Sequence, residues 1–151
     1  MDRGVTKSIK VKLAIFTAAV FIAGGCALHA SRTGVPPEVQ AVVASISEDA
    51  NEGRYEKIHS EAADEWRNDA TLEKTTAVFS TVKDKLGKVK DRQLHAASEE
   101  NTSSGRLPGH SFVLTYDTKF ERGEGMETFT LVERKGQWQL AKYFVNSTAL
   151  Q

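Results

Sequence analysis

Residues 112–120 read Phe-Val-Leu-Thr-Tyr-Asp-Thr-Lys-Phe, in which large side chains alternate with smaller or polar ones. A period of two is typical of a β-strand that buries one face. The residues that share the larger face are Phe112, Leu114, Tyr116, Thr118 and Phe120. The alternation therefore predicts a half-buried strand and identifies the face that it turns to the core.

Two more strands are predicted downstream of this one. Gly123-Glu-Gly125 indicates a hairpin turn, and residues 126–133 are rich in strand-forming side chains. A Lys-Gly pair then marks a second tight turn before residues 138–145, which alternate again. Strict alternation places Trp138, Leu140, Lys142 and Phe144 on one face of this last strand. We expect Trp138 and Leu140 to lie on the inner face, against the helices.

A fourth strand is predicted upstream, over residues 88–97, with Val89 and Leu94 as its apolar anchors. The segment 99–109 is rich in Ser, Gly, Pro, Asn and Glu, which is typical of a turn or loop. The four strands follow one another closely, so we expect an antiparallel meander.

Three helical patterns precede the strands. The first has apolar residues at helical spacing, Val39, Val42, Val43, Ile46 and Ala50, and ends at Gly53. The second places Tyr55, Ile58, Ala62 and Trp66 on one face. The third begins at Thr71 as the N-cap and runs to Gly87. Helices followed by antiparallel strands predict an α+β fold, with N-terminal helices packed on a curved four-stranded antiparallel sheet.

This order of elements resembles the cystatin-like cone of the NTF2-like superfamily. The segments 54–66, 85–88 and 136–145 also resemble a family of small bacterial exported proteins of unknown function with that fold. The resemblance covers most of residues 38–146. It implies a sheet that wraps around a helix, with room for a pocket between the two, and it implies no particular activity because one fold hosts many functions.

The N-terminal segment indicates export. Four basic residues precede an apolar run that starts at Leu13, and Ile22-Ala-Gly-Gly-Cys26 resembles the lipobox of bacterial lipoproteins. Cys26 is the only cysteine in the chain and would carry the lipid. We therefore predict a lipoprotein signal peptide over 1–25, a lipidated tether over 26–35 and a single NTF2-like domain over 36–151.

Two alternatives stay open for this segment, a cleaved secretion signal without lipid and a single uncleaved N-terminal membrane anchor. The apolar run from Leu13 to Leu28 has 16 residues, whereas a spanning helix needs about 20. The prediction is a protein of the bacterial cell envelope, lipid-anchored to a membrane and facing the periplasm or the exterior.

Charge and composition restrict the partners. The whole chain has 20 basic and 20 acidic residues, so it lacks the basic surface that nucleic acid requires. With Cys26 acylated, neither a disulfide nor a cysteine metal site can form. We predict no cofactor, no metal and no nucleic acid, and a partner that is a protein or a small ligand.

The motifs of common catalytic sites are absent from the sequence. No Gly-x-Ser-x-Gly elbow or His-Glu-x-x-His motif occurs, and structural or surface roles are expected for the four histidines. Three carboxylates that straddle the predicted hairpin turn, Glu121, Glu124 and Glu127, are expected to face solvent. No catalytic residue is therefore predicted.

The remaining candidates are inward-facing aromatic and hydroxyl side chains, namely Tyr55, Trp66, Tyr116 and Thr118. In the resembling cones such residues line the pocket between helix and sheet, although core packing is the favoured explanation for them. The favoured function is a non-enzymatic binding or interaction module tethered to a membrane. The alternative is an NTF2-like enzyme, an isomerase or hydrolase, that uses this pocket.

Overall fold

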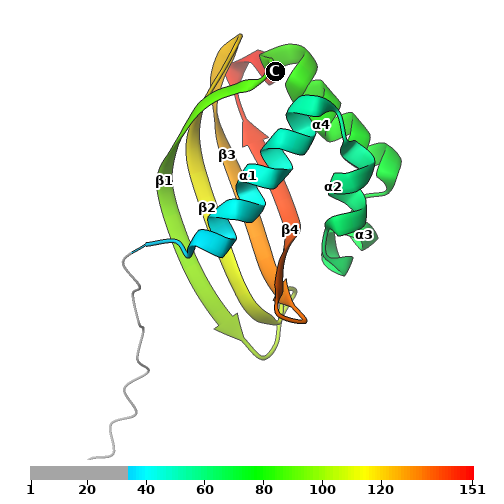
Figure 1. Ribbon diagram of the computed structural model, residues 1–151, viewed down its shortest axis with the longest axis vertical. Helices are drawn as coiled ribbons and strands as arrows, with labels where there is room; N and C mark the ends of the chain where they lie inside the picture. The colour runs from blue at the N-terminus through cyan, green and yellow to red at the C-terminus, as the bar shows by residue number, and fades with distance from the viewer. Residues whose placement is uncertain (1–33) are drawn as a thin grey trace, which may run out of the picture. The chain divides into compact units, whose positions relative to one another are not determined.

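The sheet consists of four antiparallel strands in the order β1-β2-β3-β4, and the helices lie on one side of it (Figure 1). The computed structural model describes residues 34–151. The strands are β1 (Val89–Thr102), β2 (Gly109–Phe120), β3 (Gly123–Arg134) and β4 (Gln137–Asn146). The helices are α1 (Pro37–Glu52), α2 (Tyr55–Glu61), α3 (Asp64–Asp69) and α4 (Leu72–Leu86), followed at the C-terminus by the 3-10 turn η1 (Thr148–Leu150).

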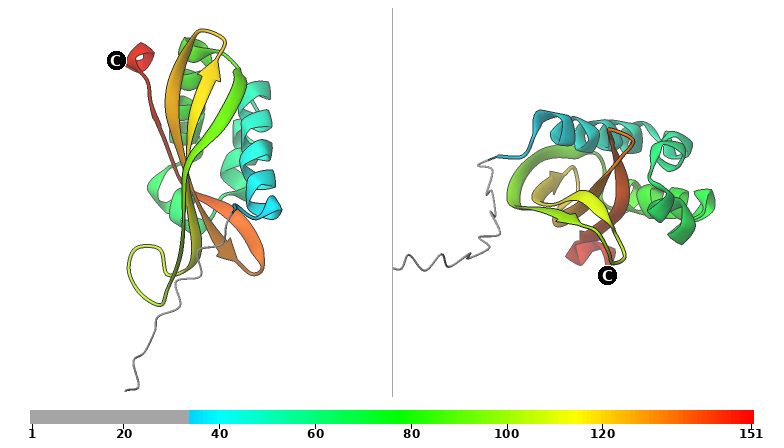
Figure 2. Two further views of the ribbon diagram at one scale, coloured as in Figure 1. Left: turned by 90° about the vertical axis from the view of Figure 1, so that its left-hand side faces the viewer. Right: turned by 90° about the horizontal axis from the view of Figure 1, so that it is seen from below.

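This arrangement confirms the predicted α+β class, with N-terminal helices packed on a curved four-stranded antiparallel sheet. Figure 2 shows α1 crossing the concave side of the curved sheet. The core lies between them and contains Val39, Val43 and Ile46 from α1 and Phe112, Leu114 and Tyr116 from β2. Burying a side chain of this size contributes about 1.5–3 kcal/mol, so these two faces supply much of the stability.

Local signals in the sequence locate the ends of the two long helices. Gly53 follows α1 with φ 77°, a left-handed conformation that glycine adopts without strain. Thr71 is the N-cap of α4, and its side chain accepts a hydrogen bond from the backbone N–H of Lys74. Gly87 follows the last turn of α4. The predicted boundaries of both helices are confirmed.

The single helix predicted from Tyr55 to Trp66 is wrong, because the chain breaks into α2 and α3. Ala62 and Ala63 adopt extended conformations with ψ 159°. The backbone N–H of Ala63 donates to the carbonyl of Leu140 in β4 at 2.9 Å. A backbone bond to the sheet therefore replaces a helical bond at this position.

The first strand is longer than predicted. Residues 99–102 were expected in a turn, but they pair with β2, and the connection is confined to residues 103–108. Leu94, predicted as an apolar anchor, is 44% exposed. It pairs with Tyr116 and so lies on the inner face, but β1 is the edge strand and the helices leave this part of it uncovered.

The predicted hairpin turn at Gly123–Gly125 is also displaced. These residues belong to β3, and Glu121 and Arg122 make the turn. A Cβ atom on Gly125 would lie 2.9 Å from the backbone oxygen of Asn146. This glycine therefore allows the close approach of β4 to β3.

A β-bulge changes the face of β4 halfway along its length. Leu140 pairs with Leu131, but Lys142 pairs with Thr130, so Ala141 is an extra residue. Trp138 and Leu140 lie on the inner face as predicted, and Trp138 is half-buried. Beyond the bulge the predicted inner face is wrong. Tyr143 points inward, and Phe144 points outward and is 64% exposed.

The predicted signal peptide and the lipidation residue Cys26 lie outside the described residues. Among residues 34–151, no helix has both the length and the apolar character needed to cross a membrane.

Candidate functional site

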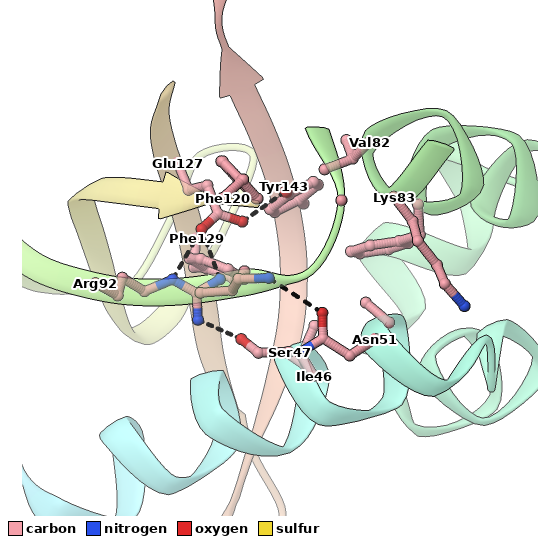
Figure 3. Close-up of a pocket in the computed structure, with 14 residues that line it drawn as sticks. Ile46, Ser47, Asn51, Val82, Lys83, Arg92, Phe120, Glu127, Phe129 and Tyr143 are labelled. Atoms are coloured by element: carbon pink, nitrogen blue, oxygen red, sulfur yellow. Dashed lines mark hydrogen bonds and ion pairs between the residues drawn. The ribbon is translucent and has the colours of Figure 1, made fainter. Parts of the chain in front are cut away.

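The inner face of the sheet carries a buried carboxylate, that of Glu127 in β3, which is 2% exposed. Its Oε2 accepts hydrogen bonds from Arg92 Nε at 2.8 Å, Arg92 Nη2 at 2.5 Å and Thr118 Oγ1 at 2.7 Å. Its Oε1 accepts from the Tyr143 hydroxyl at 2.7 Å. Donors from the three other strands thus surround Glu127, and Figure 3 shows Arg92 and Tyr143 converging on it.

Arg92 also connects the carboxylate to a helix. Its Nη1 donates to Ser47 Oγ of α1. The guanidinium carbon lies 5.2 Å from the ring centre of Phe129 and 5.7 Å from that of Tyr116, within the range of a cation–π interaction. We call Ser47, Arg92, Thr118, Glu127 and Tyr143 the Glu127 cluster. It joins β1, β2, β3, β4 and α1 at one point.

The strand register explains why these side chains meet. Arg92 pairs with Thr118, and Glu127 pairs with Tyr116 on the other side of β2. Directly paired residues of antiparallel strands point to the same face, so all four lie on the inner face. Tyr143 reaches this face only because of the bulge at Ala141.

A cavity of about 20 Å³ lies beside the Glu127 cluster, between α1, α4 and the sheet. Apolar side chains fill the space around it, including Ile46, Phe79, Val82, Phe120 and Phe129. A buried water needs about 10–15 Å³, whereas small-molecule sites measure about 300–1,000 Å³. The cavity is therefore large enough for about one water molecule. Lys83 also borders the cavity, but Figure 3 shows its amine pointing away from the Glu127 cluster.

The tyrosines of the site are held in their protonated form. Burial, followed by the nearby charge of Glu127, raises the pKa of Tyr143 well above its usual value of 10. Burial also raises the pKa of Tyr116, although the charge of Arg92 opposes the shift. At neutral pH both phenols are protonated, and that of Tyr143 donates to Glu127.

The arrangement therefore favours holding the fold over transferring protons. A general base needs a free lone pair that points at its substrate. Both carboxylate oxygens of Glu127 are already occupied by donors, and all four bonds come from charged or hydroxyl groups fixed by the strands. Glu127 could accept a substrate proton only after one of these donors moved away.

The four residues predicted to line a pocket divide into two pairs. Thr118 belongs to the Glu127 cluster, and the ring of Tyr116 packs against the Arg92 guanidinium of that cluster. Trp66 lies in α3 and donates from Nε1 to Thr75 Oγ1 in α4 at 3.0 Å. Tyr55 is half-buried in α2. Within the part of the chain that the structure describes, none of the four lines the small cavity.

The sequence interpretation missed Arg92, Glu127 and Tyr143. Glu127 was expected to face solvent beside a turn, and this expectation is wrong because β3 begins four residues earlier and buries it. Glu121 and Glu124 are exposed as expected. A charged residue two positions before an inward Phe129 was the signal that could have identified Glu127.

The histidines of the described domain bind backbone or carboxylate oxygens. His59 Nε2 lies 3.1 Å from the carbonyl oxygen of Ala70, and His95 Nδ1 lies 3.0 Å from Asp117 on the outer face of the sheet. His110 lies between Glu99 and Glu133. Over residues 34–151, no three His, Cys, Asp or Glu side chains are grouped so that they could hold a metal ion.

The fold and the site define an α+β domain with a nearly filled concave side and a buried ion-pair cluster. Residues 43–143 match the model of the family described as "Protein of unknown function (DUF4019)", and the chain belongs to this family. No match was found among curated proteins.

Among solved structures, the chain is similar to one described as "Putative Scytalone Dehydratase" from Novosphingobium aromaticivorans. The two share 10% sequence identity, with 74% of this chain and 82% of that chain covered and a TM-score of 0.43. A likeness of this size carries no inference about substrate or activity.

Proposed function

We propose that this protein is a lipid-anchored component of the bacterial cell envelope, whose folded domain is a non-enzymatic interaction module. The sequence around Cys26 supports the anchor, because a basic stretch, an apolar run and small residues precede the only cysteine. Acylation at Cys26 would place the domain at a membrane surface, facing the periplasm or the exterior.

The observation that carries the module is the filled concave side of the sheet. The cavity beside the Glu127 cluster measures about 20 Å³, and the carboxylate of Glu127 has bonds on both of its oxygens. A site for a substrate needs a larger concave space and polar groups that lack partners. Recognition therefore falls to the outer surface of the domain.

A second candidate, an NTF2-like enzyme, is favoured by one specific observation. Glu127, Tyr143 and Arg92 place a carboxylate, a phenol and a cation together beside a cavity, and such groups can serve acid–base chemistry. For this to occur, α1 or α4 would have to move outward and open the cavity to a substrate.

Turnover assays with the acylated full chain distinguish these two functions. We expect no activity on panels of hydrolase and isomerase substrates, and we expect Tyr143→Phe and Tyr55→Phe to be equally inactive. The proposal would be overturned by a measurable turnover that Tyr143→Phe abolishes while Tyr55→Phe and the unfolding midpoint stay unchanged. Tyr55 is the matched control because it is a half-buried tyrosine outside the cavity.

A further inference from the structure

His110 of β2 lies between two carboxylates that come from the strands on either side of it. Its Nε2 is 2.6 Å from Glu99 Oε1 in β1, and its Nδ1 is 3.0 Å from Glu133 Oε2 in β3. An imidazole ring donates from both nitrogens only when it is protonated. The geometry therefore fits an imidazolium that bridges β1 and β3 across β2.

The surroundings of His110 hold the ring in place without competing for its protons. Its ring centre lies 4.8 Å from that of Trp138 in β4, in an edge-to-face arrangement, and 5.7 Å from that of Phe112. Glu133 also borders an open groove that contains Glu38 of α1 and Glu61 of α2. The neighbouring cation, Arg134, binds Glu65 of α3. The charged groups that act on His110 are Glu99 and Glu133, and both favour its protonated form.

The position of Glu99 makes this bridge important for the edge strand. β1 is held near its start by Arg92, which binds Glu127, and seven residues later by Glu99, which binds His110. The residues from Ala96 to Thr102 are exposed and have a partner strand on one side only. Within residues 34–151, the bond from His110 to Glu99 is the charged contact that adds to the backbone pairing of this half of β1 with β2.

We propose that His110, Glu99 and Glu133 form a pH-sensitive clamp that fixes the distal half of β1 in its protonated state and releases it when His110 loses its proton. The neutral ring has a single N–H, so one carboxylate then faces a lone pair, and the two carboxylates repel each other across the ring. The backbone ladder with β2 remains, so the segment 96–102 loosens and the domain stays folded.

The direction of the pH dependence follows from the balance of forces on the ring. Burial lowers the pKa of His110, but the hydrogen bonds and charges of Glu99 and Glu133 outweigh it and raise the pKa above its usual value of 6.5. The clamp is therefore fully present below about pH 6.5 and is lost as the pH rises through the raised pKa.

Hydrogen–deuterium exchange of the full chain between pH 5.5 and 9 tests this proposal. The protection factor of the backbone amides in 96–102 is measured after correction for intrinsic exchange, and deuterium uptake at the imidazole carbon gives the midpoint of each histidine. We expect protection in 96–102 to fall by roughly fivefold, the effect of a partly exposed ion pair, as His110 titrates. Protection that stays constant through the His110 midpoint would overturn the proposal.

Two variants separate the clamp from a general effect of pH on the sheet. His110→Gln should remove the step, whereas His95→Gln should keep it, since His95 binds one carboxylate on the exposed outer face of the same two strands. If His110→Gln fails to fold, Glu99→Gln takes its place. It retains a neutral hydrogen-bond partner, and it should lower the His110 midpoint and weaken the step. A step of unchanged size in either clamp variant contradicts the mechanism.

Discussion

Glu127 is a charge that the fold can hold only because its partners are fixed by three other strands. Arg92, Thr118 and Tyr143 bind it, and burial removes most of the water that would otherwise solvate it. A buried pair of this kind contributes little net stability compared with apolar residues of the same shape, but breaking it leaves one buried charge without a partner. The cluster therefore restricts the arrangement of the strands more than it increases the overall stability.

The first prediction concerns the loss of this charge. Glu127→Gln should lower the free energy of unfolding by about 3–5 kcal/mol, because the Arg92 guanidinium, whose side chain is 13% exposed, loses its anion. Glu124→Gln, an exposed carboxylate on the same strand, should change it by less than about 0.5 kcal/mol. Urea unfolding measures both.

A double variant identifies the cause of this loss. Arg92→Met combined with Glu127→Gln should cost clearly less than the sum of the two single changes, since neither charge is then left alone. Equal costs for Glu127→Gln and Glu124→Gln would mean that Glu127 is solvated and that the cluster does not form in solution.

Sequence reasoning found one member of the Glu127 cluster. Thr118, and Tyr116 beside the cluster, were placed on the inner face correctly because strong alternation in β2 defines that face. Arg92 and Glu127 are 35 positions apart, and no local pattern indicates which charged residues pair across a sheet. Glu127 was therefore expected in solvent, as a charged residue beside a turn usually is.

At the scale of elements, the bulge in β4 determines which side chains enter the core. Ala141 is the extra residue, and it changes the inward set from Trp138 and Leu140 to Tyr143 and Val145. The sequence carried no signal of this change. Strict alternation continues the inward face from Leu140 to Phe144, and no residue near Ala141 marks the bulge. The break between α2 and α3 was missed for a similar reason, because it depends on a bond from Ala63 to a strand 77 positions later.

The second prediction tests the bulge directly. Leu140→Ala should lower the free energy of unfolding by about 2–5 kcal/mol, as expected for a buried leucine. Phe144→Ala should cost less than about 0.5 kcal/mol because its ring is largely exposed. Strict alternation predicts comparable costs for the two, so similar values in thermal and urea unfolding would contradict the bulge.

The third prediction concerns the junction of α1 and α2. Asp49 is buried at the end of α1, where it accepts from Arg54 Nε at 2.7 Å and from Lys57 Nζ at 2.8 Å. Burial raises the pKa of Asp49, but the bonds to Lys57 and Arg54 outweigh it and lower the pKa below 3.8. A lowered pKa stabilises the fold above about pH 4, and this contribution is lost as the pH falls through the folded value.

Unfolding free energies measured between pH 6 and pH 2 check this dependence. Asp49→Asn should be less stable than the parent at pH 6, and the difference between them should shrink towards pH 2. Glu48→Gln, an exposed neighbour, should follow the parent at every pH. A constant difference between Asp49→Asn and the parent would show that the ion pairs contribute nothing.

For the whole molecule, the order of elements was sufficient to predict the fold class. Three features of the sequence carried it, namely helical spacing before Gly87, alternation after it, and short connections between the strands. The degree to which the concave side is filled could not be predicted, because it depends on how Phe79, Phe120 and Phe129 interlock across elements that are far apart in the sequence. Of the predicted pocket residues, Trp66 and Tyr116 pack in the core, Thr118 binds Glu127 and Tyr55 is half-buried in α2.

The fourth prediction concerns attachment to the membrane. Cys26→Ser removes the thiol that forms the thioether, so the acyl label should be lost and the protein should leave the membrane fraction. Stable anchoring needs two signals, and even one acyl chain binds only marginally. Because the variant would carry no acyl chain, its loss from the membrane fraction should be nearly complete. Metabolic labelling with fatty acid and cell fractionation measure it. A variant that stays in the membrane at full precursor size would favour the uncleaved anchor.

The most direct test of a domain with a filled concave side is a crystal structure of the protein purified from the membrane of its own cells. We expect ordered water alone in the cavity of about 20 Å³, with Nε and Nη2 of Arg92 bound to Glu127. Continuous density for an organic molecule between α1 and α4, with Arg92 turned from Glu127 onto that molecule, would contradict the interaction module and favour the enzyme.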